Sequence, residues 1–307
     1  MHYTLHQLQV FAKVVHKKSI TKAAEELHMT QPAVSIQLKN LQDQFDIPLT
    51  EIVGRQLYVT DFGLEIFGMA ERIINEVYAI NYKTHAYKGH LSGRLKISIV
   101  STGKYIMPYF LANFLNKHSN VELLLDVTNK SKVMNSLENN EVDFALVSVL
   151  PEKLPVEKVD LMTNKLYVVG NMDKIFKKGI YDKKIFEQLP FIFREPGSGT
   201  RVVMEKFIAK NKLPIHKKME LTSNEAVKQA VIAGLGYSIM PLIGLKNELL
   251  NKDLQIVHVK DFPIKSTWHL IWPKHKKFSP VAEAYLKYIK ADKEKIIKDT
   301  FEWFDKY

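Results

Sequence analysis

The fold of the N-terminal part is decided by residues 19–42, which read SITKAAEELHMTQPAVSIQLKNLQ. Ser19 is a typical N-cap, and the apolar residues that follow it recur at helical spacing, which predicts a helix over 20–28. Thr30 and Pro32 are residue types that begin helices, so a further helix is expected directly afterwards. Two short helices joined by so tight a turn are typical of a helix-turn-helix.

The neighbouring segments complete a small N-terminal domain. The apolar spacing in residues 4–17 predicts an amphipathic helix before the pair, and the alternating, β-prone residues 55–60 predict one strand of a small wing. Residues 61–87 form a longer helical pattern with apolar positions close to a heptad. A helix of this length with one apolar seam more often pairs with a partner than stands alone. We therefore expect dimerisation through Ile66, Met69, Ile73, Val77 and Ile80.

Beyond this helix the pattern of apolar residues changes from one long helix to alternating short strands and helices. Residues 88–93, Lys-Gly-His-Leu-Ser-Gly, break the helical pattern and are typical of a hinge. Segments 95–100, 121–127 and 144–149 are predicted strands with helical segments between them, which indicates an α/β architecture with a largely parallel sheet. The alternation repeats after residue 165. The end of the chain returns to strand plus helix, so we expect it to cross back into the first of two lobes.

These observations predict a division of the chain into four parts. The expected parts are a winged helix-turn-helix domain over 1–62, a dimerisation helix over 63–88, a hinge over 89–92 and a two-lobed α/β domain over 93–307, with the first lobe at about 93–163 and 268–307 and the second at about 164–267.

Composition narrows the class of protein. The chain has 307 residues and 35.5 kDa, of which 46% are hydrophobic and 25% charged, which suits a globular protein of two or three domains. No stretch approaches the ~18–20 apolar residues of a membrane helix. The N-terminus lacks the basic and apolar regions of an export signal, so we expect a cytoplasmic protein without a membrane partner. The absence of cysteine excludes disulfides, thiol catalysis and thiolate metal sites.

The charge balance favours an anionic partner but does not locate it. The net charge is +11 and the pI about 9.4, which is typical of nucleic-acid binding. Residues 1–90, however, hold nine basic and nine acidic side chains, so the remaining residues carry the whole excess. The prediction that the N-terminal domain binds DNA therefore rests on its motif. Its neutral balance predicts weak non-specific affinity per domain, because few phosphates are neutralised.

The first 63 residues contain an ordered motif made of Phe11, Val14, Ser19, Ile20, Thr21, Ala23, Ala24, Leu27, Thr30, Gln31, Pro32, Ala33, Val34, Ser35, Gln37, Leu38, Leu41, Pro48, Leu49, Gly54, Arg55, Val59, Thr60 and Gly63. This motif resembles the LysR-type transcriptional regulators, and the alternating second half extends the resemblance to nearly the whole chain.

The resemblance implies both a fold and a function. It implies a winged helix-turn-helix, a dimerising linker helix and a two-lobed effector domain like a periplasmic binding protein. It further implies homodimers that assemble into homotetramers, binding to dyad-symmetric DNA, contact with the transcription machinery, and a small metabolite that binds between the lobes and changes transcription.

Three departures from the family pattern concern the DNA-binding domain. Where the family usually has Leu-Phe-x-Arg, residues 49–52 read Leu-Thr-Glu-Ile, so an aromatic and a basic side chain are missing. Gln42 stands where Glu is usual, and Ile36 where many members carry Arg. These changes leave the expected fold intact but weaken the transfer of base and phosphate contacts from relatives.

The free face of the helix that begins at Thr30 is the candidate DNA-reading surface. Its apolar stripe faces the core, and the remaining side chains can bridge adenine, meet a thymine methyl group or bind phosphate. A wing arginine can reach phosphate or the minor groove. The alternative interpretation is a set of solvated polar residues on a small helical domain. The expected DNA-binding residues are Gln31, Pro32, Ala33, Ser35, Ile36, Gln37, Lys39 and Arg55.

The candidate effector site combines loops of both lobes. Residues 194–201, Arg-Glu-Pro-Gly-Ser-Gly-Thr-Arg, lie between a predicted strand and helix, where glycines let backbone N–H groups converge into an anion nest. The two arginines add charge and bidentate geometry. An ordinary turn with solvated arginines is the alternative. This run also resembles the branch of the family that regulates carbon fixation, which implies a phosphorylated or anionic effector. The expected effector-binding residues are Ser101, Thr102, Thr128, Asn129, Ser148, Arg194, Ser198, Thr200 and Arg201.

Two other functions compete with a ligand-responsive regulator. One is an enzyme that holds a phosphate in the glycine-containing loop, but no Gly-x-Ser-x-Gly elbow and no base near Ser198 supports catalysis. The other is a solute-binding protein, which the absent export signal and the additional helix-turn-helix disfavour. The histidines show no metal-binding spacing. We therefore expect no catalytic residues, no metal and no cofactor.

Overall fold

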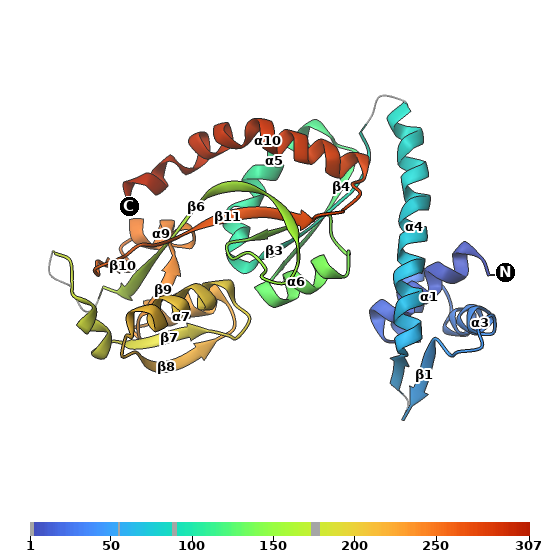
Figure 1. The fold of residues 1–307 in the computed structure, drawn as a ribbon, viewed down its shortest axis with the longest axis horizontal. Coiled ribbons are helices and arrows are strands. Elements are labelled where there is room, and N and C mark those ends of the chain that lie inside the picture. Colours follow the sequence, from blue (N-terminus) through green and yellow to red (C-terminus); the bar gives the residue numbers. More distant parts are fainter. Residues whose placement is uncertain (1–2, 55, 88–90, 173–178) are drawn as a thin grey trace. The chain divides into compact units, whose positions relative to one another are not determined.

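The computed structural model describes residues 3–54, 56–87, 91–172 and 179–307 (Figure 1). The chain divides into two compact units, Met1–Gly89 and His90–Tyr307. Each unit builds its own hydrophobic core.

Three capped helices form the base of the first unit. They are α1 (Leu5–Lys17), α2 (Ile20–Leu27) and α3 (Gln31–Gln42). The hydroxyls of Thr4, Ser19 and Thr30 each accept a hydrogen bond from a backbone N–H in the first turn of the helix that follows. The predicted helix-turn-helix is therefore present, because local capping and the apolar spacing specify the same elements.

The wing is a hairpin of two strands, of which the sequence predicted only one. Strand β1 (Thr50–Val53) pairs antiparallel with β2 (Gln56–Val59). Most of β1 is exposed, so it shows no apolar alternation. Two of the residues that depart from the family pattern, Gln42 and Thr50, form hydrogen bonds with each other here. The Gln42 side-chain oxygen accepts hydrogen bonds from the backbone N of Thr50 at 3.1 Å and from its hydroxyl at 3.0 Å. This polar contact therefore joins two of the positions that depart from the pattern of the family that the sequence resembles.

Helix α4 (Asp61–Tyr87) carries two apolar faces. One face packs against the helix-turn-helix core through Ala70 and Ile74. The other exposes Met69, Ile73 and Ile80, whose exposed fractions are 50%, 45% and 64%. Of the remaining residues expected at the seam, Ile66 packs against the unit's own core and Val77 is half-buried. The exposed apolar face therefore contains three of the five residues that the heptad spacing predicted.

The second unit is built on a curled seven-stranded sheet with the order β10-β6-β11-β5-β3-β4, in which β9 also pairs with β6. Its strands are β3 (Gly93–Val100), β4 (Val121–Thr128), β5 (Phe144–Val147), β6 (Val156–Asn171), β9 (Ser238–Pro241), β10 (Leu254–Val257) and β11 (Ile264–Pro273).

The expectation of a largely parallel sheet is wrong for this sheet as a whole. Strand β3 pairs in parallel with β4 and β5, but β6 pairs antiparallel with β9, β10 and β11, and β11 also pairs antiparallel with β5. The reason is that β6 and β11 are connections that run in opposite directions between the lobes. Apolar alternation identifies strands but not their direction.

The first lobe covers the parallel strands with helices. These are the 3₁₀-helix η1 (Ser101–Tyr105), α5 (Met107–Lys117), α6 (Lys130–Glu138), α10 (Pro280–Phe301) and the 3₁₀-helix η4 (Glu302–Lys306). Residues 302–307 are docked on β6, because the Lys165 ammonium donates hydrogen bonds to the backbone oxygens of Phe304 and Tyr307, both at 2.9 Å.

The second lobe has a separate core around a parallel strand pair. Strand β7 (Pro190–Arg194) pairs with β8 (His216–Leu221), and a bridge from Phe191 to Tyr237 leads toward β9. The other elements are the 3₁₀-helices η2 (Lys183–Glu187) and η3 (Leu242–Gly244), and the helices α7 (Gly199–Asn211), α8 (Asn224–Ile232) and α9 (Lys246–Leu250).

Two long strands join the lobes. Strand β6 contributes Leu161 to the core of the first lobe and Val168 to that of the second. Strand β11 runs beside it, with Ile264 opposite Leu166 and further pairs along its length. The sequence indicated further strands after residue 165 and near the end of the chain, but not two long strands that join the lobes. Figure 1 shows both strands running between the lobes.

Candidate functional site

Helix α3 presents an exposed face in the first unit. Gln31, Pro32, Ile36 and Lys39 are exposed, and the exposed fraction of Ile36 is 57%. Three further expected residues, Ala33, Ser35 and Gln37, are half-buried. The Gln31 amide nitrogen donates a hydrogen bond to the Ser35 hydroxyl at 3.0 Å. The face thus offers amide, hydroxyl and methyl groups, which are the groups that contact base edges. Arg55 lies outside the described residues.

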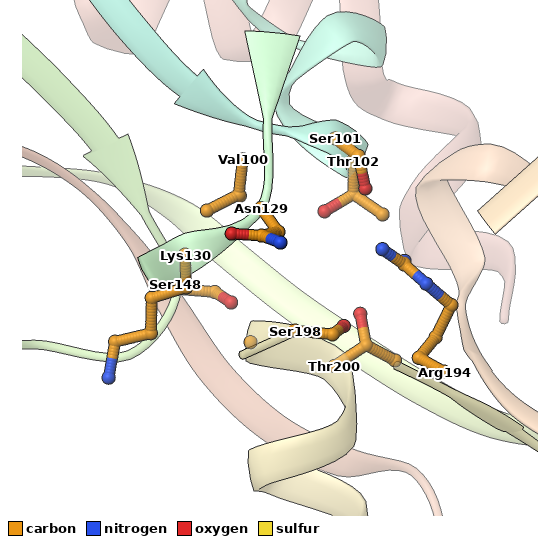
Figure 2. Close-up of a pocket in the computed structure, with 10 residues that line it drawn as sticks. Val100, Ser101, Thr102, Asn129, Lys130, Ser148, Arg194, Ser198 and Thr200 are labelled. Carbon is orange, nitrogen blue, oxygen red and sulfur yellow. The ribbon is translucent and has the colours of Figure 1, made fainter. Parts of the chain in front are cut away.

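A second candidate site lies in the second unit, where three strands end at one edge. Because β3 pairs in parallel with β4 and β5, residues after Val100, Thr128 and Val147 emerge together. A cavity that is partly open to solvent lies here, between these strand ends and the loop after β7 (Figure 2), and its empty volume, with the solvent-open part included, is about 220 Å³. It is lined by Val100, Ser101, Thr102, Asn129, Lys130, Ser148, Arg194, Ser198, Gly199 and Thr200.

The cavity brings together most of the residues expected to bind an effector. Those that line it are Ser101, Thr102, Asn129, Ser148, Arg194, Ser198 and Thr200. Thr128 and Arg201 were expected there but do not line it. The cavity is also lined by three residues that the sequence pattern did not predict, Val100, Lys130 and Gly199. Each of them is the chain neighbour of an expected residue, and this adjacency is the signal that could have found it.

Two helix N-termini flank the cavity. Helix α6 follows Asn129, whose side-chain oxygen accepts a hydrogen bond from the backbone N of Lys132 at 3.1 Å. Helix α7 follows Ser198, whose hydroxyl accepts from the backbone N of Arg201 at 3.5 Å. Unpaired backbone N–H groups and the positive end of the macrodipole make such termini favourable for an anion.

Arg194 supplies a buried guanidinium group, with 4% of the residue exposed. Its Nε and Nη2 donate hydrogen bonds to the two carboxylate oxygens of Glu195 at 2.8 and 3.0 Å. Figure 2 shows the guanidinium reaching toward Thr102. Within the described part of the chain, no hydrogen bond from Nη1 is present, so this nitrogen is available to a ligand. Glu195 fixes the orientation of Arg194 and offsets its charge.

Arg201 acts outside the cavity. Its Nη1 donates to the Arg194 carbonyl oxygen at 2.8 Å and to Glu220 at 2.6 Å, and its Nε donates to Glu205 at 2.7 Å. Burial opposes the charge of Arg201, but the hydrogen bonds to Glu205 and Glu220 outweigh it and raise the pKa of the guanidinium. The sequence could not distinguish a cavity arginine from one that holds the loop, because both flank the same glycine-containing run.

Lys130 lines the cavity with its stem. Figure 2 shows its ammonium group directed away from the centre of the cavity. Burial lowers the pKa of Lys130, and the nearby Lys206 lowers it further. The expected residue Thr128 ends β4 opposite Val100, and its side chain lies outside the lining.

The lobes touch on both sides of the cavity. The Asn224 amide nitrogen donates to the Ser101 hydroxyl at 3.0 Å, and the backbone N of Ser131 donates to the Gly197 carbonyl at 3.3 Å. Gly197 has φ +86°, and a Cβ there would lie 2.6 Å from the Ser131 hydroxyl. Only glycine allows this close approach without strain.

Within the described residues, no three histidine or carboxylate side chains are grouped so that they could hold a metal ion. None of the helices in that part of the chain combines the length and apolarity needed to span a membrane.

Comparison with known proteins matches both units to one family. Residues 5–64 match the model described as bacterial regulatory helix-turn-helix protein, lysR family, and residues 88–293 match the LysR substrate binding domain. A RuBisCO operon transcriptional regulator from Allochromatium vinosum is 37% identical over 94% of this chain and 96% of its own length. The HTH-type transcriptional activator CmpR from Synechocystis is 36% identical over 95% of this chain and 97% of its own.

A solved structure is also similar to the second unit. It is the Synechocystis CcmR regulatory domain in complex with 2-PG, which is 31% identical, has a TM-score of 0.64, and covers 66% of this chain and 98% of its own. The relatives are transcriptional regulators, not enzymes. The helix-turn-helix, the two-lobed domain and these matches together show that the chain belongs to the LysR family of bacterial transcriptional regulators.

Proposed function

We propose that this regulator binds dyad-symmetric promoter DNA and changes transcription when a small anionic metabolite occupies the cavity between the lobes. The observation that carries the proposal is the cavity itself. It joins two helix N-termini with the buried Arg194 and with hydroxyl groups from both lobes.

An anion suits this cavity for a physical reason. Ser101, Ser148 and Thr200 offer hydroxyls, and the helix N-termini offer N–H groups, so one oxyanion can accept several bonds at once. Among the described residues that line the cavity, Arg194 adds a formal charge that points into the space, and Glu195 balances much of it. The 2-PG in the complex of the similar CcmR domain supports this choice of ligand class.

DNA binding is assigned to α3 and the wing. Gln31 and Ile36, which are exposed, would contact base edges in the major groove, and the exposed Lys39 would contact phosphate. Pro32, Ala33, Ser35 and Gln37 complete this surface, with Arg55 in the wing. A dyad-symmetric site requires two copies of the domain.

Self-association is assigned to the exposed face of α4. Met69, Ile73 and Ile80 would be covered in a dimer, with Val77 beside them. Further pairing into a tetramer would add avidity, which offsets the neutral charge of residues 1–90. The partners proposed for the assembly are double-stranded DNA, the effector and the transcription machinery, and its proposed location is the cytoplasm.

The response requires that the effector bind two arrangements of the protein with different affinity. The contacts between Asn224 and Ser101 and between Ser131 and Gly197 are made in one relative position of the lobes. A ligand that bridges both lobes would favour that position. The lobes would then bias the arrangement of the two DNA-binding domains.

Fluorescence anisotropy tests the proposal with the full-length protein. The protein is titrated into a duplex from its own upstream intergenic region and into a scrambled duplex, each at two salt concentrations. The native duplex is expected to bind more tightly, and inorganic phosphate or 2-phosphoglycolate is expected to change that affinity. Equal binding to both duplexes at both salt concentrations, together with no effect of either anion, would contradict the proposal.

A further inference from the structure

Residues 302–307, which we call the strap, follow α10 and lie against β6 where this strand passes between the lobes. The residue of β6 that holds them is Lys165. On the strand it stands between Leu161, which belongs to the core of the first lobe, and Val168, which belongs to that of the second. Figure 1 shows the end of α10 near α9. The strap therefore lies at the junction of the lobes.

The contacts of the strap with Lys165 are polar and largely shielded from solvent. Only 13% of the Lys165 side chain is exposed. Its ammonium group donates hydrogen bonds to the backbone oxygens of Phe304 and Tyr307, both at 2.9 Å. The same group lies 3.7 Å from the Asp305 carboxylate and 4.9 Å from the centre of the Phe304 ring. Hydrogen bonds from a charged donor are stronger than those between neutral groups, so Lys165 anchors the strap to the strand.

The strap also offsets a repulsion between β6 and β11. Lys165 lies directly opposite Lys265 in the antiparallel pair that these strands form. Like charges in this position destabilise the pairing, because the two side chains point to the same face of the sheet. The strap brings two backbone oxygens and the Asp305 carboxylate to this position. It therefore stabilises the two strands that join the lobes.

A second contact of the strap is made with the second lobe. The Lys246 ammonium, at the start of α9, lies 5.3 Å from the centre of the Trp303 ring, a distance at which a cation and an aromatic ring attract each other. Phe304, of which 3% is exposed, packs in the apolar cluster of the first lobe, and this cluster also includes Leu242 and Ile243 of η3. Helix α9 and η3 are elements of the second lobe, whereas α10 covers the first. The strap therefore connects the lobes independently of β6 and β11.

We propose that the strap is a conformational restraint, which holds the two lobes in their described relative position before any ligand binds. Its anchors are Lys165 on β6 and Lys246 on α9. When an anchor is lost, α10 separates more easily from the second lobe, and the contacts across the cavity open more often. A ligand that bridges the lobes then has to order them itself, which raises its apparent Kd. The inference concerns the protein without ligand, so its test is independent of the proposed function.

Hydrogen exchange of the full-length protein without ligand tests the restraint. The reporter is the amide of Ser131, on α6 of the first lobe, which donates to the Gly197 carbonyl of the second lobe at 3.3 Å. This amide exchanges when the contact opens, so its rate measures how often the lobes separate. The amides of Ile97 and Ile99 are the internal reference, because both residues are fully buried in the core of the first lobe.

Two variants remove the anchors one at a time. Lys165→Met removes the ammonium group and keeps an unbranched side chain, so exchange at Ser131 should become about tenfold faster, the size expected for one lost hydrogen bond to a charged group. Lys246→Met removes the cation over Trp303 and should accelerate exchange at Ser131 by about threefold. Exchange of the reference amides should stay unchanged in both. Lys265→Met is the matched control, because this exposed lysine lies opposite Lys165, and its loss should not accelerate exchange at Ser131.

Each outcome decides the proposal. Faster exchange at Ser131 in both anchor variants, with unchanged reference amides, would support it. An unchanged rate at Ser131 in both would overturn it. Equal acceleration at Ser131 and at the reference amides would also overturn it, because the strap would then contribute only to global stability. The same acceleration in Lys265→Met would assign the effect to the strand pair and reject the strap. If Lys165→Met does not fold, Lys246→Met decides between these outcomes.

Discussion

At the scale of single residues, Glu195 limits the hydrogen bonds that Arg194 can donate to a ligand. Its carboxylate accepts hydrogen bonds from two of the three guanidinium nitrogens and fixes the orientation of the group, so the third nitrogen is left to donate into the cavity. A guanidinium held in this way acts as a directed hydrogen-bond donor more than as a point charge. Arg201, seven residues later, holds the backbone of Arg194 from outside.

The role of Arg194 predicts the effect of Arg194→Lys. Lysine retains a charge for Glu195 but cannot also present a directed donor to the cavity, so phosphate affinity should fall by about tenfold or more. DNA binding without ligand should be unchanged. Calorimetry and anisotropy measure the two properties separately. Arg94→Lys is the matched control, because Arg94 is an exposed arginine with a carboxylate partner, Glu122. A parallel loss of DNA binding in Arg194→Lys would contradict the separation of roles.

Gln31 provides a test of base reading. The amide at the start of α3 is exposed and contacts only a hydroxyl of its own helix within the described residues. Gln31→Ala should therefore weaken the preference for one base at one position of each half-site. The free-energy difference between the preferred base and the others at that position should fall by about 1–3 kcal/mol. Selection from a library of site variants measures this preference. Lys158→Ala, in the second unit, should leave it unchanged, and an unaltered preference in Gln31→Ala would remove this residue from the reading surface.

Asp143 predicts a dependence of stability on pH. Burial raises the pKa of this carboxyl group above its unfolded value of 3.8. The native state therefore favours the protonated form, and its stability falls as the pH rises through the raised pKa. Asp143→Asn cannot ionise, so its free energy of unfolding relative to the unmodified protein should increase between about pH 4 and about pH 7. Urea unfolding at both pH values measures this, and a constant difference would contradict it.

At the scale of elements, α4 has to serve two surfaces at once. Ala70 and Ile74 pack against the helix-turn-helix core, while Met69 and Ile73 are exposed. Apolar side chains on two faces of a helix are expected where one face packs on its own domain and the other packs on a second copy of the chain.

The proposed dimerisation face predicts the effect of Ile73→Asp. A carboxylate at an apolar interface would be desolvated without a partner, so the dimer should dissociate at concentrations where the unmodified protein remains associated. Sedimentation velocity measures this change. Asn75→Asp introduces the same side chain at another exposed position of α4, and it should leave the dimer intact. Dissociation in both variants, or in neither, would contradict the assignment.

The elements that sequence patterns missed share a physical reason. Strands β1 and β8 are mostly exposed, so they lack alternation, and β10 and α9 are only four and five residues long. Strand β6 has 16 residues, but only its second half showed a continuous apolar run in the sequence. Helix α2, which has an N-cap and regularly spaced apolar residues, begins at the residue where the sequence predicted its start.

At the scale of the whole molecule, charge is distributed unevenly along the chain. Residues 1–90 carry no net charge, and the remainder carries +11. If the proposed surface binds DNA, few phosphates are neutralised per domain, and affinity should depend only weakly on salt. Lys39→Ala should reduce the slope of log affinity against log salt concentration by about 0.9 per bound domain. Anisotropy across a salt series measures the slope. Lys158→Ala should not change it, and an unaltered slope in Lys39→Ala would exclude a phosphate contact by that residue.

The sequence by itself determined the helix-turn-helix, the long helix and the α/β character of the second half. Each depends on caps, spacing and composition within a few turns of chain. It also identified most residues of the cavity, because strand ends and a glycine-containing loop are local signals. Only the tertiary structure decided that β6 and β11 run antiparallel between the lobes, and that Arg201 lies outside the cavity while Lys130 lines it. It also revealed that residues 302–307 connect the lobes through Lys165 and Lys246. These features depend on the direction and depth of side chains from segments far apart in the sequence, which local patterns do not encode.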